Sequence, residues 1–215
     1  SDAIGYYGEG GQAANQSAYW QNLFDRKAEW GPTYFDARHM FTVSHVWAVP
    51  YGKGHKWGNS VHPVLNGVLG GWQLGGIMTL RSGFPLTIQA SDNSTTSSRG
   101  ARARVVGKGG NTLGNVGSGA KWFDITAYAN QLAKSFGDVG IGTERGPGFK
   151  TYDVSLQKQF AVTERVKFEL RGEFINLFNT PQFAAPARNV TGATFGEITS
   201  AQYERNGQIA LRLTF

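Results

Sequence analysis

The sequence predicts an all-β fold in which antiparallel strands form the last part, about five strands, of a transmembrane β-barrel. Five segments alternate apolar and polar side chains with a period of two, which places successive side chains on opposite faces of a strand. No run of about 20 mainly apolar residues is present to form a spanning helix. Charged residues make up 17% of the chain, below the roughly 25% typical of soluble domains, and the 30 glycines are about twice the average.

The first two alternating segments, 37–49 and 72–89, are the least regular of the five. His45 is a polar side chain among the apolar positions of the first segment. The second segment keeps its apolar residues at even positions, and we expect an interruption near Pro85 because proline cannot donate a ladder hydrogen bond. Both segments still predict strands.

The other three segments, 152–160, 166–174 and 203–215, alternate cleanly. The polar face of the middle segment carries charges of alternating sign, at Lys167, Glu169, Arg171 and Glu173, which predicts a neutralised ladder facing water rather than a catalytic carboxylate pair. The last segment ends on its apolar face. We expect four side chains to form a lipid-facing stripe and assembly signal there: Ile209, Leu211, Leu213 and Phe215.

The connections differ in length at the two strand ends. Residues 161–165 form a hairpin-length turn, whereas the stretches 90–150 and 179–202 are long. Short periplasmic turns and long extracellular loops are the outer-membrane arrangement, so the pattern predicts an outer-membrane β-barrel with long extracellular loops. Residues 122–130 are expected to add a strand or a short helix to the longest loop. The stretch 50–71 fits this arrangement poorly, because it is on the expected periplasmic side and yet is about twenty residues long.

A soluble two-sheet sandwich is the alternative, because its strands alternate in the same way around a shared core. Aromatic residues at the strand ends favour the membrane, where they form interfacial girdles. Lys158 stands two residues from a strand end, from which its stem can snorkel to the interface. The residues assigned to the girdles are Trp47, Trp72 and Phe160 near the end that holds Phe215, and Tyr152 and Tyr203 toward the other end.

One basic cluster is a candidate binding site. Arg99, Arg102 and Arg104 lie in a loop rich in serine and glycine. Because guanidinium groups bind phosphate oxygens through two parallel hydrogen bonds, the cluster suits an anionic substrate or the phosphates of lipopolysaccharide. A solvated loop without a ligand is the alternative.

Catalytic and metal chemistry find no support in the sequence. The chain has no cysteine, and its four histidines lack the spacing of a metal site. Neither a complete phosphate-binding loop nor a G-x-S-x-G nucleophile motif is present. We therefore expect no catalytic, cofactor-binding or metal residues, a protein that is not an enzyme, and no nucleic-acid partner despite the net charge of +6.

Eight short motifs occur in the order in which they occur in a known family. They are FDARH at 35–39, VPYGKG at 49–54, GGWQ at 70–73, SGFP at 82–85, GPGF at 146–149, TER at 163–165, EFINLFN at 173–179 and TFGEI at 194–198. In this order they resemble the carboxyl-terminal barrel of TonB-dependent receptors of the Oar-like, carboxypeptidase-regulatory-like kind found in acidobacteria. The similarity covers essentially the whole chain.

The resemblance implies a location in the bacterial outer membrane and a role in importing a large nutrient. It implies that residues 1–215 are the carboxyl-terminal segment of one barrel domain, whose plug and accessory domain are not in this sequence. The implied partners are the rest of the same barrel, the TonB complex through the missing plug, and outer-membrane lipid and lipopolysaccharide. The alternative function is a soluble structural or adhesive β-sheet protein that mediates assembly.

Overall fold

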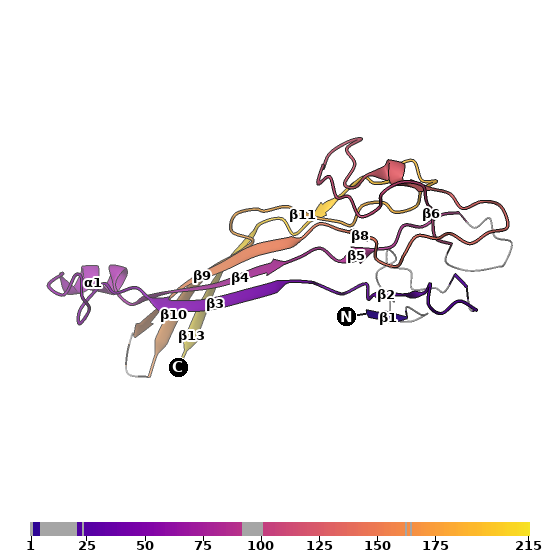
Figure 1. Ribbon diagram of the computed structural model, residues 1–215. Coiled ribbons are helices and arrows are strands. Elements are labelled where there is room, and N and C mark those ends of the chain that lie inside the picture. The colour runs from indigo at the N-terminus through magenta and orange to yellow at the C-terminus, as the bar shows by residue number, and fades with distance from the viewer. Residues whose placement is uncertain (1, 5–20, 23, 92–100, 162, 164) are drawn as a thin grey trace. The chain divides into compact units, whose positions relative to one another are not determined.

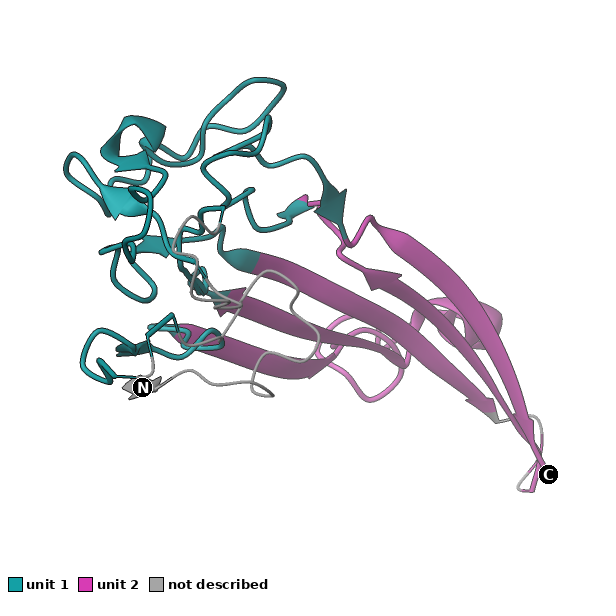
Figure 2. Ribbon diagram, turned by 90° about the vertical axis from the view of Figure 1, so that its right-hand side faces the viewer, with its two compact units in different colours: residues 1–39, 81–149, 182–202 teal, residues 40–80, 150–181, 203–215 magenta. Residues whose placement is uncertain are grey.

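The structure is a computed structural model that describes residues 2–4, 21–22, 24–91, 101–161, 163 and 165–215 (Figure 1). The chain divides into two compact units, which are coloured separately in Figure 2. We call residues 40–80, 150–181 and 203–215 the sheet unit, and residues 1–39, 81–149 and 182–202 the loop unit. In the described residues, no helix is both long and apolar enough to cross a membrane.

The five predicted strands form one sheet with the order β13-β10-β9-β4-β3. Strand β10 pairs antiparallel with both β9 and β13. The bounds are β3 Met40–Ala48, β4 Trp72–Arg81, β9 Phe149–Ala161, β10 Lys167–Ile175 and β13 Asn206–Thr214. The prediction of antiparallel strands is therefore confirmed, and each predicted segment contributes one strand to this sheet.

Three strands are shorter than predicted, and two of them have a local cause. The second segment stops at Arg81, and Pro85–Leu86 forms a separate short strand, β5, so the interruption near Pro85 is confirmed. The last segment starts at Asn206 rather than at Tyr203. Tyr203 has a φ of 59°, in the left-handed region, which is incompatible with a continuous strand.

The register places apolar side chains of neighbouring strands on one face of the sheet. Phe168 is opposite Leu213 and Leu170 is opposite Leu211 across the β10–β13 pair. On the other side of β10, Phe168 is opposite Phe160. Side chains that face each other across a ladder point to the same face. The odd positions of β13 and the even positions of β9 and β10 thus build one continuous apolar face.

The connection from β3 to β4 contains the α-helix of the described chain, α1 Pro63–Leu69 (Figure 1). Proline at the first helical position is favoured because its missing N–H would have no partner there. The Asn66 side chain accepts a hydrogen bond from the backbone N–H of Lys53, at 2.7 Å, and fixes the connection. The connection 50–71 is therefore long because it contains an ordered helix, which the strand pattern did not predict.

The loop unit is built from short strand pairs. They are β1 Asp2–Ile4 with β2 Trp30–Pro32, β5 Pro85–Leu86 with β8 Glu144–Arg145, β6 Arg104–Val105 with β7 Tyr128–Ala129, and β11 Gln182–Phe183 with β12 Ala201–Gln202. The 3-10 helix Ile125–Ala127 precedes β7, so the stretch 122–130 contains both a helical turn and a strand. The unit has its own core, made of Ile88, Ala103, Phe123, Ala127, Tyr128, Val139 and Phe195.

We predict that Leu211→Arg destabilises the protein in a bilayer by about 2–4 kcal/mol, because it puts a charge on the lipid-facing side near mid-membrane. Ala210→Arg is the matched control, one residue away on the opposite face, and its cost should be smaller. Refolding titrations of both variants into lipid vesicles measure the difference. Equal destabilisation at the two positions contradicts the assignment of the faces.

Candidate functional site

The apolar face of β13 carries the residues predicted to form the lipid-facing stripe. Ile209 is 80% exposed, Leu211 64%, Leu213 59% and Phe215 93%. A contiguous exposed patch of large apolar side chains marks contact with a membrane or another protein. The polar side chains of β13 are exposed as well, so the two faces differ in chemistry and not in exposure. Whether Phe215 acts as an assembly signal stays a prediction.

Lys158 is a charged residue on the apolar face, and the structure provides it with local partners. Its ammonium group donates a hydrogen bond to the backbone carbonyl of Gly70. The same group lies 4.9 Å from the centre of the Phe160 ring and 5.7 Å from that of Trp72, within the range of cation–π attraction. Lys158 is only 4% exposed, so it is covered by the 49–71 connection instead of snorkelling into water.

His45 is the second polar side chain on this face, and it is stacked on Tyr152. The two rings are nearly parallel, with centroids 6.0 Å apart, and the Tyr152 hydroxyl lies 3.3 Å from Nε2 of His45. Glycine at position 76 makes this possible, because a Cβ there would lie 2.5 Å from the His45 ring. Phe178 stacks on Tyr152, with ring centroids 5.7 Å apart. A polar pair is thereby shielded by aromatic surface.

The opposite face of the sheet is polar and internally paired. Arg171 forms an ion pair with Glu173, and Glu173 also accepts a hydrogen bond from Gln208 of β13. The side-chain amide of Gln157 donates to Gln73 at 2.9 Å. These contacts agree with a neutralised ladder on a water-filled side of the sheet.

The residues assigned to aromatic girdles lie near strand ends. Phe160 and Leu213 both lie opposite Phe168, on its two neighbouring strands. Phe160 is therefore at the same end of the sheet as Phe215. Trp47 is half-exposed near the end of β3, and the indole N–H of Trp72 donates to the carbonyl of Val68 in α1. Tyr152 and Tyr203 lie toward the other strand ends. Contact of these rings with lipid headgroups stays a prediction.

The structure describes two of the three arginines of the predicted anion-binding loop. Arg99 lies outside the described residues. Arg102 is 4% exposed, and its guanidinium donates to the carboxylate of Glu29 at 3.0 Å. Burial lowers the pKa of Arg102, and the charge of Glu29 opposes this shift. Arg104 is half-buried in β6. Anion binding by the cluster stays a prediction, but Arg102 can take part only if its pair with Glu29 opens.

Ion pairs join distant segments within the loop unit. Besides the pair of Arg102 with Glu29, Lys121 binds Glu197 at 2.7 Å, and Arg145 binds Asp36 at 3.0 Å. The partners are 73, 76 and 109 residues apart in the chain. Local sequence patterns contain no signal for ion pairs between residues so far apart, and the sequence analysis did not predict these three pairs.

A buried tyrosine and carboxylate form another polar contact in the loop unit. The Tyr128 hydroxyl donates to Glu144 at 2.5 Å, and the backbone N–H of Gly110 donates to the same oxygen at 2.8 Å. Burial, followed by the hydrogen bond to Glu144, raises the pKa of Tyr128 well above its usual value of 10. The hydroxyl therefore stays protonated and keeps its role as a donor.

The loop unit also contains a cavity of about 450 Å³. Its lining combines hydroxyl groups with one carboxylate and one aromatic ring, from Ser118, Thr199, Ser200, Glu197 and Phe183. This lining comes from three stretches of the chain, 116–118, Phe183 and 197–201, which no local sequence pattern relates to one another. Among the described residues, no group of three or more histidine, aspartate or glutamate side chains is arranged to hold a metal ion.

We predict that Glu29→Gln destabilises the loop unit by about 3–5 kcal/mol, because it leaves the buried guanidinium of Arg102 without a counter-charge. The double variant Glu29→Gln, Arg102→Met should recover much of the loss, since it removes both charges. Thermal unfolding of the purified variants measures both effects. A single variant as stable as the wild type means that the pair does not hold the unit together.

The comparisons with known proteins agree with the architecture. A family model described as an outer membrane beta barrel domain matches residues 1–208. No curated protein sequence and no solved structure matches the chain. The family match decides against the soluble sandwich and places the protein in the bacterial outer membrane. The chain, with its antiparallel sheet and its apolar face, therefore belongs to the outer membrane beta barrel domain family.

Proposed function

We propose that this chain is the barrel segment of a TonB-dependent outer-membrane receptor that imports a large nutrient. The observation that carries the proposal is the loop unit. The long connections 82–148 and 176–205 join their strands at the same end of the sheet. Most of their residues belong to a unit with a core, ion pairs and a cavity. Loops that fold in this way can form a rigid surface that recognises a ligand outside the cell.

The difference in length between the connections at the two ends of the strands supports a receptor rather than a simple membrane anchor. An anchor needs only short turns, because ordering a loop costs roughly 1–2 kcal/mol of backbone entropy per residue. The loop unit offsets that cost with buried side chains such as Phe123 and Ile88, which are fully buried. The eight motifs shared in order with Oar-like receptors point to the same function.

The partners in this proposal follow from the architecture. The rest of the barrel pairs with the outer edges of β13 and β3, because hydrocarbon offers no hydrogen bonds to an open strand edge. A plug domain transmits energy from the TonB complex, while outer-membrane lipid and lipopolysaccharide surround the apolar face. The chain binds and passes its cargo without changing it chemically, and so acts without catalytic residues or a cofactor.

We predict that every compound left unconsumed in the culture medium after deletion of this gene is also left unconsumed after deletion of tonB. Energy from TonB should be required for every compound that this receptor imports, so both deletions should slow its uptake at least tenfold. Mass spectrometry of spent medium measures the depletion, and a plasmid copy of the gene should restore it in the first strain only.

Two results would contradict the proposal. The first is a compound that depends on this gene but is still consumed without TonB. The second is unchanged consumption of all compounds together with a loss of cell adhesion, which would support the structural or adhesive alternative.

A further inference from the structure

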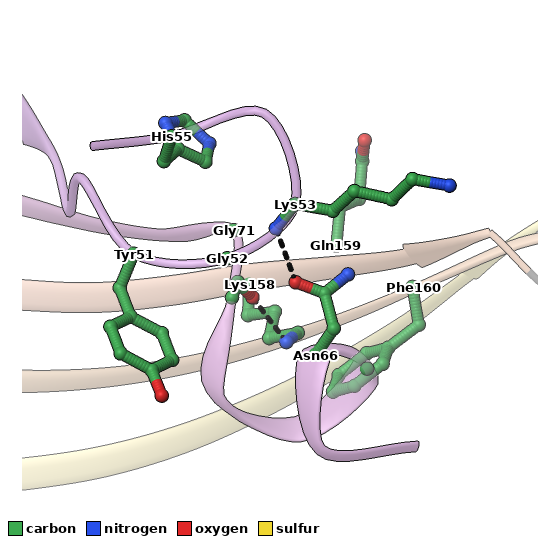
Figure 3. Close-up of a pocket in the computed structure, with 11 residues that line it drawn as sticks. Tyr51, Gly52, Lys53, His55, Asn66, Gly71, Lys158, Gln159 and Phe160 are labelled. Atoms are coloured by element: carbon green, nitrogen blue, oxygen red, sulfur yellow. Dashed lines mark hydrogen bonds between the residues drawn. The ribbon is translucent and has the colours of Figure 1, made fainter. Parts of the chain in front are cut away.

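The connection between β3 and β4 is unusual in charge. Residues 49–71 contain Lys53, Lys56, His55 and His62 but no aspartate or glutamate. A connection on the side of short turns needs no such length. Its residues line a cavity of about 320 Å³, shown in Figure 3, together with the end of strand β9.

The cavity holds a buried positive charge. Lys158 lines it and, with only 4% of its surface exposed, has one hydrogen-bond acceptor, the carbonyl of Gly70 (Figure 3). In the described part of the chain, no carboxylate lies within ion-pair distance of its ammonium group. An ammonium group has three donors, and a buried charge is costly unless an anion balances it. Lys53 adds a second positive charge to the lining, which also includes His55 and Tyr51.

The helix beside the cavity exposes apolar side chains. Val64 is 68% exposed, Leu65 53%, Val68 57% and Leu69 46%, and none of the residues of α1 is buried. Residues four apart lie on the same side of a helix, so these four side chains form one stripe. Apolar side chains at this density facing water would be unfavourable, and they suit the boundary between headgroups and acyl chains.

The cavity and the apolar face of the sheet are continuous. Lys158 and Phe160 belong to the apolar face of β9, where they follow Leu156 in the alternation, and both line the cavity. A molecule that fills the cavity with its anionic part therefore reaches the apolar face with its remaining part. Among membrane components, a glycerophospholipid has this combination of a phosphate and two acyl chains.

We propose that residues 49–71 and Lys158 bind one glycerophospholipid of the periplasmic leaflet. The phosphate lies in the cavity against Lys158 and Lys53, and the acyl chains follow the apolar stripe of α1 and the apolar face of β9. Lysine binds phosphate as a point charge. This site depends on the position of the barrel in the outer membrane and is independent of TonB, so its failure leaves the proposed import function untouched.

The test of the cavity uses the protein expressed from its own gene, purified in detergent and analysed by native mass spectrometry. The probes are phosphatidylglycerol, diacylglycerol and inorganic phosphate. We expect phosphatidylglycerol to be retained at least tenfold more than diacylglycerol. Lys158→Met should reduce retention about tenfold, and Lys53→Gln, at an exposed side chain, should reduce it with no effect on folding. The control Lys167→Met, an exposed lysine on the polar face of the sheet, should leave retention unchanged.

Three results in this experiment would overturn the proposal. Equal retention of diacylglycerol and phosphatidylglycerol means that the phosphate is not recognised. Displacement of the lipid by millimolar inorganic phosphate means that the site binds a free anion. The third is a loss of retention in the Lys167→Met control equal to the loss in Lys53→Gln. This result means that lipid binding does not depend on the charges that line the cavity.

The test of the helix uses the absence of cysteine, which lets a single introduced cysteine carry a fluorophore. A fluorophore at Val68→Cys should be quenched by brominated phosphatidylcholine in vesicles, whereas one at Ser60→Cys, exposed in the same connection, should be quenched by iodide in the buffer. Quenching of the Val68 label by iodide alone means that α1 faces water. Protection of that label from both quenchers means that a protein covers α1. Either result contradicts lipid contact.

Discussion

Hydrogen bonding of the sheet backbone is the constraint on which the rest of this structure depends. A membrane interior offers no partner for a backbone N–H or carbonyl, so strands can cross it only when neighbouring strands pair with them. The ladders of β10 with β9 and β13 meet this requirement over most of their length. Side chains then alternate between two faces, and the sequence must supply apolar residues to one of them.

Polar residues on the apolar face show how strict this requirement is. Lys158 and His45 would each be costly in hydrocarbon, and each has a local polar partner, the Gly70 carbonyl for Lys158 and the Tyr152 hydroxyl for His45. At His45 a glycine allows the close approach, since a Cβ at Gly76 would collide with the stacked rings. The same face therefore tolerates two polar groups without interrupting its contact surface.

The loop unit follows different rules, because water is present around it. Its segments are held by the core around Phe123 and by ion pairs such as Lys121 with Glu197. Desolvation offsets part of the attraction in such pairs, but breaking one of them would leave a partly buried charge without its partner. A loop unit held in this way keeps its surface and its cavity in one shape, as recognition of a ligand requires.

The sheet could be predicted from the sequence because alternation is a local signal. The pattern from 152 to 160 and from 166 to 174 gave strands and faces directly, and Pro85 marked a break that the structure contains. The left-handed backbone at Tyr203 has no such signal, since tyrosine rarely adopts it. The partners Glu29 and Arg102 are 73 residues apart, so their contact depends on the folded unit and not on local pattern.

In a bilayer, one face of this sheet should contact lipid and the other should contact water. Spin labels placed one at a time along β13, from Asn206 to Thr214, in the protein reconstituted into a bilayer, test it most directly. Apolar oxygen and a water-soluble nickel complex then report the surroundings of each label. Collisions with oxygen should peak at every odd position, including Ile209, Leu211 and Leu213, and collisions with the nickel complex should peak at every even position. The same accessibility at odd and even positions would contradict it.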